Sequence, residues 1–170
     1  YVALLCREIE ETAEIAKKLD LQIETVYIGG GTPTTLSGEQ LSAVMGALNA
    51  HFKLQNLREF TVEAGRPDTV TEERLLSILQ GCAPRIRINP QTMNDRVLRA
   101  VGRRHAAKDT VKAMQLARRL GFSNINMDLI AGLPEDTIES FQQSLEEVLK
   151  LSPESVTVHT LCLKRSAKLS

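Results

Sequence analysis

Apolar positions follow two alternating patterns along the chain. Repeats of three to four residues predict amphipathic helices over 2–18, 37–52, 71–79, 95–101, 107–120 and 138–149. Short runs rich in β-branched residues predict buried strands over 23–28, 60–63, 85–88, 124–128 and 155–160. Strands that alternate with helices in this way predict right-handed βαβ units and a parallel sheet.

Signals at the helix ends support this division of the chain. Ser37 and Gln40 form a capping-box signature at the start of helix 37–52. Gly121 follows helix 107–120, where a left-handed C-terminal residue is preferred. No linker, charged block or low-complexity segment interrupts the alternation, so we expect residues 1–170 to belong to one domain.

Glycines or polar residues end every predicted strand. They are Gly29 to Pro33, Glu63 and Ala64, Asn89 to Gln91, Asp128, and His159 with Thr160. Parallel α/β folds place their ligand sites at the carboxyl ends of the strands. Groups from successive strand ends converge most easily in a curved sheet, so we expect a barrel-like closure and not an open doubly wound sheet. Helices are then expected on the convex side, with Gly31, Glu63, Gln91 and Asp128 at one rim.

Composition narrows the classes of partner. The 21 Lys and Arg residues balance the 21 Asp and Glu residues, so no overall field attracts nucleic acid or anionic lipid. The sequence has no apolar run of about 20 residues, the length that spans a bilayer, and we expect no membrane partner. Cys6, Cys82 and Cys162 are far apart and fit neither a disulfide framework nor a zinc spacing. This favours a cytoplasmic protein without a metal site in this chain.

The glycine run and the strand-end carboxylates each allow two interpretations. Gly29 to Gly31 let the main chain approach a ligand, but a tight turn explains them equally well. The spaced glycines of a dinucleotide site and the lysine of a phosphate loop are absent. Glu63 and Asp128 can accept hydrogen bonds from ribose hydroxyls or from an ammonium group. They can equally cap a helix or form a structural ion pair.

Three basic residues are just as ambiguous when each is taken alone. Arg103 can hold a ligand carboxylate through two parallel hydrogen bonds, although a solvent-exposed arginine is the commoner case. His105 is expected at the surface for the same reason. His159 is expected to be a core histidine with a satisfied hydrogen bond, with a place facing the barrel interior as the alternative.

Several segments together resemble the radical S-adenosylmethionine enzymes. Residues 27–34, Tyr-Ile-Gly-Gly-Gly-Thr-Pro-Thr, are similar to the glycine-rich motif of that family, and residues 63–68 to its next strand end. Within the family, segments 88–95, 101–103 and 124–134 resemble the oxygen-independent coproporphyrinogen III oxidases, or dehydrogenases. Segments 89–94 and 157–161, with Lys164 and Arg165, resemble the Gram-positive type. The resemblance runs over residues 1–170.

This resemblance implies a partial (β/α)6 TIM-like barrel of the radical S-adenosylmethionine type. The family binds a [4Fe–4S] cluster through a Cys-x3-Cys-x2-Cys loop after the first strand. This sequence has no such triplet. We therefore expect the chain to supply the second to sixth strands, with the first strand missing, and to be catalytically inactive alone.

The resemblance also implies which residues contact S-adenosylmethionine. They are Gly30, Gly31, Thr32, Glu63, Gln91, Arg103, Asp128 and Cys162. The glycines and Thr32 hold the methionine end, with Glu63 near the amino group or ribose. Gln91 and Asp128 bind the ribose, Arg103 pairs with the carboxylate, and Cys162 lies near the adenine. No residue of this chain is implied as a nucleophile or general base.

For the full-length protein, the resemblance implies radical chemistry on a porphyrinogen. A 5′-deoxyadenosyl radical abstracts hydrogen from a propionate, and loss of carbon dioxide leaves a vinyl group. Two such events convert coproporphyrinogen III to protoporphyrinogen IX in heme biosynthesis. Candidate cations for the substrate carboxylates, by charge alone, are Arg87, Arg104, Lys164 and Arg165, although a solvent-exposed position is the commoner case for each. The alternatives are a heme-binding relative without decarboxylase activity, a heme chaperone, or another radical enzyme of the family.

Overall fold

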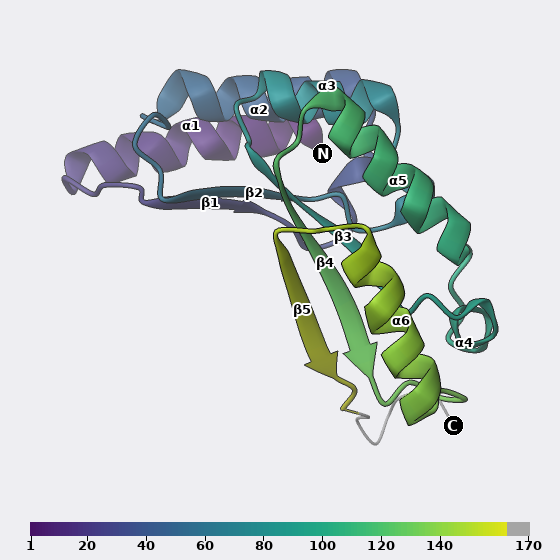
Figure 1. Cartoon of the computed structure of the whole chain (residues 1–170). Helices are drawn as coiled ribbons and strands as arrows, with labels where there is room; N and C mark the ends of the chain where they lie inside the picture. Colours follow the sequence, from purple (N-terminus) through teal and green to yellow (C-terminus); the bar gives the residue numbers. More distant parts are fainter. Residues whose placement is uncertain (163–170) are drawn as a thin grey trace.

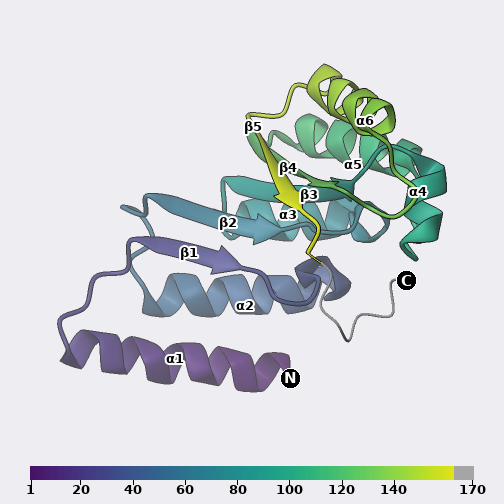
Figure 2. The same ribbon diagram turned by 90° about the horizontal axis from the view of Figure 1, so that it is seen from below.

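Five parallel strands form one curved sheet in the order of the sequence (Figures 1 and 2). The strands are β1 Thr25–Ile28, β2 Glu59–Glu63, β3 Arg85–Gln91, β4 Asn124–Ala131 and β5 Ser155–Thr160. The computed structural model describes residues 1–162. Each strand pairs with the next in parallel register, which confirms the expected sheet and its order.

The helices cover the convex face of this sheet (Figures 1 and 2). They are α1 Val2–Lys18, α2 Gly38–His51, α3 Glu72–Gln80, α4 Asp95–Ala100, α5 Ala107–Leu120 and α6 Ile138–Lys150. Two short 3₁₀ turns, η1 Pro33–Thr35 and η2 Pro67–Thr69, follow β1 and β2. Within the described residues the concave face carries no helix, so it remains open as in a partial barrel.

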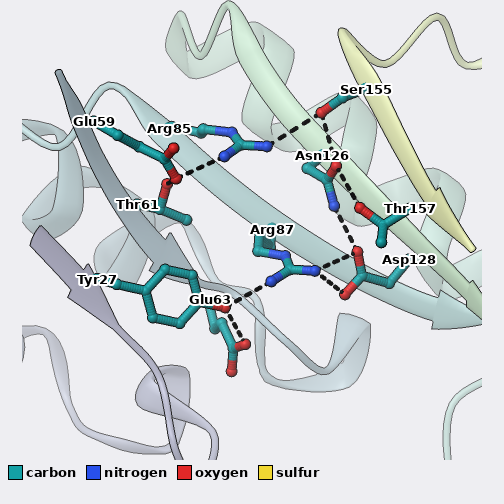
Figure 3. Close-up of polar contacts among 10 residues, drawn as sticks. All are labelled: Tyr27, Glu59, Thr61, Glu63, Arg85, Arg87, Asn126, Asp128, Ser155 and Thr157. Atoms are coloured by element: carbon teal, nitrogen blue, oxygen red, sulfur yellow. Dashed lines mark hydrogen bonds and ion pairs between the residues drawn. The ribbon is translucent and has the colours of Figure 1, made fainter. Parts of the chain in front are cut away.

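Side chains alternate between an apolar and a polar face of the sheet. The apolar positions are fully buried under the helices, and they include Val62, Ile86, Ile88, Ile125, Met127 and Leu129. Burying such a side chain contributes about 1.5–3 kcal/mol, so this layer supplies much of the stability. The intervening positions on β2, β3 and β4 are polar and face the concave side (Figure 3). The fold therefore leaves its chemistry on the uncovered face.

The helix ends follow the sequence signals. The Ser37 side chain accepts from the Gln40 backbone while the Gln40 side chain accepts from the Ser37 backbone, which completes the capping box. Gly121 ends α5 with a φ of 100°, in the left-handed region that favours glycine. Both expected helix boundaries are confirmed.

Strands β3 and β4 each continue three residues beyond the predicted end, and the extension of β4 corrects the placement of Asp128. Strand β4 continues past Asp128 to Ala131, because its last residues pair with Val158, His159 and Thr160 of β5. Asp128 therefore lies inside the strand on the concave face, and not at its end. An acid is a poor strand former, but pairing on both sides overrides that local preference.

Candidate functional site

The glycine loop after β1 is open toward the rim of the sheet. Gly30 has a φ of 105°, and a Cβ atom added at Gly30 or Gly31 would meet nothing within 4 Å. A Cβ at Gly29 would lie 2.5 Å from the Tyr27 ring, so that glycine serves packing. The Thr32 carbonyl accepts from both the backbone and the hydroxyl of Thr35, which fixes the end of the loop. Main-chain groups at Gly30 and Gly31 are thus accessible to a ligand.

Arg87 lies at the centre of a polar network on the concave face (Figure 3). Its Nη2 atom donates to both carboxylate oxygens of Asp128, at 2.8 and 2.7 Å. Its Nη1 atom donates to the Tyr27 hydroxyl at 2.8 Å, and that hydroxyl donates to Glu63. The network therefore links β1, β2, β3 and β4 and joins two of the expected ligand residues, Glu63 and Asp128.

The electrostatics of this network hold Arg87 in its charged form. Burial by itself lowers the pKa of Arg87, but hydrogen bonds to Asp128 and Tyr27 raise it above its usual value. Burial raises the pKa of Tyr27, as does its hydrogen bond to Glu63, while Arg87 opposes that shift. At neutral pH the tyrosine is therefore a neutral donor to Glu63 and an acceptor from Arg87.

Asp128 has little free capacity as an acceptor. Its side chain is only 7% exposed, and Oδ1 also accepts from Asn126 Nδ2 at 2.5 Å. His159 Nε2 lies 3.7 Å from Oδ2, and the imidazole is more than half exposed on the concave face. The expectation of a core histidine at 159 is therefore wrong, and the alternative facing the interior is confirmed. The reason is that β5 is the edge strand of the described sheet.

Gln91 and Arg103 line a pocket of about 540 Å³ at the rim. Gln91 ends β3 with a φ of 70°, a left-handed conformation that is rare outside glycine and often found at functional sites. Arg103 lies between α4 and α5, where burial lowers its pKa, nearby Arg66 lowers it further and Asp68 opposes the shift. Within residues 1–162, Arg103 forms no salt bridge. A guanidinium in that setting can receive a ligand carboxylate.

His105 lines the same pocket but is not a surface residue, contrary to expectation. It is 4% exposed, and its Nε2 atom lies 3.2 Å from the carbonyl oxygen of Pro90. The loop folds back over the end of β3, and this burial cannot be recognised from the local sequence. His105 thereby fixes the segment that carries Arg103 against the strand that carries Gln91.

The structure places the expected ligand residues in three groups, of which Gly31 and Thr32 line a separate pocket between α1, β1 and α2. Glu63 and Asp128 belong to the concave network, whereas Gln91 and Arg103 line the rim pocket. Cys162 is exposed and free, and the preceding Leu161 lines the rim pocket. Lys164 and Arg165, two of the expected substrate cations, lie outside the described residues.

Sequence reasoning did not identify the structural role of Arg87 and Tyr27. Arg87 entered only as a possible cation for substrate carboxylates, and Tyr27 only as part of the glycine motif. The alternation along β3 could have revealed the role, because it places Arg85, Arg87 and Asn89 on the face opposite Ile86 and Ile88. Three polar side chains on one strand face indicate a polar interior.

The described residues supply no cluster site and no membrane span. Cys6 lies on α1, Cys82 follows α3 and Cys162 follows β5, and no group of three possible metal ligands occurs in residues 1–162. In the same residues, no helix has the length and apolar character needed to cross a bilayer.

Comparisons with known proteins show which family this chain resembles. The family model of the Radical SAM superfamily matches residues 1–148. The oxygen-independent coproporphyrinogen-III oxidase-like protein HemZ of Bacillus subtilis is 43% identical over 164 residues, which cover 96% of this chain and 33% of that protein. The heme chaperone HemW of the same organism is 37% identical over 165 residues, or 96% of this chain and 43% of that protein.

A solved structure shows the same arrangement of elements. The structure of coproporphyrinogen III oxidase HemN from Escherichia coli, described as a radical SAM enzyme, matches with a TM-score of 0.84 and 30% identity. The match covers 95% of this chain and 37% of that one. The chain thus spans less than half the length of these relatives. On the family match and on the fold, this chain belongs to the radical SAM superfamily.

Proposed function

We propose that this chain is the S-adenosylmethionine-binding part of a cytoplasmic protein that oxidatively decarboxylates coproporphyrinogen III to protoporphyrinogen IX. The observation that carries the proposal is the rim pocket, in which Arg103 is partly buried, free of salt bridges within the described residues, and next to Gln91. A pocket with an unpaired guanidinium and an amide suits an amino-acid carboxylate beside a sugar. The identity to HemZ and the likeness to HemN support the choice of reaction.

The residues present fit the chemical groups of S-adenosylmethionine. The cofactor carries an ammonium, a carboxylate and two vicinal hydroxyls. Glu63 offers a carboxylate for the ammonium, Arg103 a guanidinium for the carboxylate, and Gln91 with Asp128 polar groups for the ribose. The open backbone at Gly30 and Gly31 lets the methionine end approach the strand. We propose these contacts, with Thr32 beside the glycines and Cys162 near the adenine.

Another pocket in the described residues fits this ligand less well. It encloses about 400 Å³ between α1, β1 and α2, and its lining includes Gly31 and Thr32 of the glycine loop but no charged side chain. A zwitterionic ligand would lose its hydration there without a charged partner. We therefore propose the rim pocket for the carboxylate of the cofactor, with the glycine loop as a contact from the neighbouring pocket.

The bound cofactor, next to a reduced [4Fe–4S] cluster held by other parts of the protein, would supply a radical that abstracts hydrogen from a propionate. The part played by this chain is to bind and orient. Arg103, Gln91 and the carboxylates fix the cofactor in one pose, and the apolar layer beneath the sheet keeps the strands rigid. No side chain of this chain is needed as an acid, base or nucleophile.

The candidate cations for the substrate differ in their availability. Arg87 is already engaged by Asp128 and Tyr27, so a porphyrinogen carboxylate would have to displace one of them. Arg104 is exposed and lines the rim pocket, which leaves it open to an anion. We therefore propose Arg104 before Arg87 as a contact of the substrate.

A heme chaperone is the second candidate. Relatives of that name from Bacillus subtilis and Lactococcus lactis are 37% and 34% identical over nearly the whole of this chain. The proposed cofactor site serves both functions, so the distinction lies in the fate of the tetrapyrrole.

The deciding experiment uses the full-length protein, anaerobically loaded with its cluster and supplied with S-adenosylmethionine, a reductant and coproporphyrinogen III. The proposal predicts formation of protoporphyrinogen IX together with 5′-deoxyadenosine and carbon dioxide. Stable binding of heme without any decarboxylation would establish the second candidate instead. No binding or cleavage of S-adenosylmethionine would contradict both.

A further inference from the structure

Arg87 connects the two carboxylates at the proposed cofactor site. The guanidinium donates to Asp128 through Nη2 and to the Tyr27 hydroxyl through Nη1 (Figure 3). The Tyr27 hydroxyl in turn donates a hydrogen bond to Glu63. The Arg87 side chain is 19% exposed, and its Nε atom is buried without a hydrogen-bond partner in residues 1–162. Its position is therefore set by the groups at its far end. Loss of the hydrogen bonds to Asp128 or to Tyr27 therefore alters the position of the guanidinium.

Counting acceptor sites shows how Arg87 limits Asp128. A carboxylate oxygen accepts about two hydrogen bonds. Oδ1 already accepts from Arg87 and Asn126, whereas Oδ2 accepts from Arg87 only, with His159 at 3.7 Å. One acceptor position therefore remains, on Oδ2. Asp128 can take one ligand hydroxyl while it keeps Arg87, but it cannot take two.

We infer that Arg87 is a positioning residue that couples the Glu63 and Asp128 ends of the cofactor site. The inference rests on the proposed function, because it takes both carboxylates as contacts of S-adenosylmethionine. While Asp128 holds the guanidinium, Tyr27 is oriented to fix Glu63 toward the rim. If Asp128 loses its charge, Arg87 is released toward Tyr27 and Glu63, the nearest remaining acceptors, and Glu63 becomes less available to the ligand.

The same strand offers a matched control. Arg85 lies two positions earlier on the same face and donates to Glu59 at 2.7 Å and to Ser155 at 3.3 Å. It also bridges strands on the concave face, from β2 to β5, and it makes no direct contact with Glu63 or Asp128 (Figure 3). It reaches Asp128 only through Ser155 and Asn126. A general effect of removing an interior arginine would therefore appear equally at Arg85 and Arg87.

The test is a double-mutant cycle of S-adenosylmethionine affinity in the cluster-loaded full-length protein. Affinity is measured by equilibrium titration for wild type, Glu63→Gln, Asp128→Asn and the double variant, and again in Arg87→Met and Arg85→Met backgrounds. With Arg87 present, the fold loss of affinity in the double variant should be smaller than the product of the two single-variant fold losses. The difference should be about fivefold or more. With Arg87→Met, the losses should multiply to within about twofold, and with Arg85→Met the coupling should remain.

Each other outcome has a defined meaning. If Glu63→Gln and Asp128→Asn each weaken binding but the coupling survives in Arg87→Met, Arg87 does not couple them and the cofactor site stands. If neither substitution weakens binding, the site and the inference fail together. Should Arg87→Met not fold, Arg87→Lys takes its place. Lysine keeps the charge but cannot hold two partners with a planar fork, so it too should abolish the coupling.

Discussion

The Nε2 atom of His105 lies 3.2 Å from the carbonyl oxygen of Pro90, and this contact joins the two sides of the rim pocket. A carbonyl oxygen only accepts, so the imidazole must carry its proton on Nε2. Pro90 precedes Gln91 at the irregular end of β3, and His105 follows Arg103 by two positions. A buried histidine therefore sets the relation between two proposed ligand residues.

His105→Ala should destabilise the protein by about 2–4 kcal/mol, because it leaves a cavity and an unpaired buried carbonyl. Denaturant unfolding of the wild type and the variant measures the difference. His51→Ala is the control, since His51 is exposed in the last turn of α2 and its loss should cost less than about 0.5 kcal/mol. Equal effects at the two histidines would mean that the His105 contact contributes nothing.

Arg103→Lys in the intact protein should weaken S-adenosylmethionine binding by about a hundredfold, because an ammonium cannot reproduce a two-bonded guanidinium fork. Arg104→Ala serves as the comparison, since Arg104 is exposed beside the same pocket. The measurement is binding, with cluster absorbance recorded to show that the cluster is unaffected. If Arg104→Ala loses binding while Arg103→Lys keeps it, the carboxylate contact is Arg104.

The two loop glycines should respond differently to substitution by alanine. Gly30→Ala should cost about 1–2 kcal/mol of unfolding free energy, because its φ of 105° is unfavourable for a residue with a Cβ. Gly31 has no such backbone and open space around it, so Gly31→Ala should change stability by less than about 0.5 kcal/mol. Gly31→Ala should nevertheless weaken cofactor binding. Unchanged binding would show that the ligand does not approach the backbone at Gly31.

Glu154 should make stability depend on acid pH. Burial opposes the effect, but hydrogen bonds from Arg118 and from the Ile125 backbone lower the pKa of Glu154. The folded-state pKa lies below the unfolded value of about 4.3, so the stabilisation is complete above that value. It is lost as the pH falls toward the folded-state pKa. Allowing for solvent screening, Glu154→Gln should cost about 1 kcal/mol at pH 7.

The measurement for Glu154 is the difference in unfolding free energy between wild type and variant across the acid range. That difference should shrink as the pH falls. Glu146→Gln, at an exposed position on α6, should show a negligible difference at every pH. A constant difference for Glu154→Gln would mean that the carboxylate charge is not responsible.

Residues 1–170 produced alone should not take up a stoichiometric [4Fe–4S] cluster. Cys6, Cys82 and Cys162 lie on separate parts of the fold, and a cluster of this family needs three cysteines together. Anaerobic reconstitution with iron and sulfide, followed by absorption spectroscopy and iron analysis, checks this. A full cluster spectrum would overturn it. The triple variant with all three cysteines replaced by serine gives the background of adventitious iron.

The secondary structure was largely predictable because local patterns determine it. The β-branched runs, the capping box at Ser37 and the glycine at 121 each act within a few residues, and the structure confirms them. The strand ends were less predictable. Residues 129–131 form part of β4 because β5 pairs with all three and Gln91 of β3 pairs with Leu129, and both partners are remote in the sequence.

The parallel βαβ order, the glycine loop and the polar character of the strand ends follow from the sequence, since hydrophobic period, turn chemistry and residue type are local properties. Tertiary structure alone decided which polar groups meet. Arg87 reaches Asp128 and Tyr27 because curvature and register bring β1, β3 and β4 together on the concave face. The loop over β3 buries His105 and leaves Arg103 facing a pocket. Burial and pairing depend on segments distant along the chain, so no local pattern could specify them.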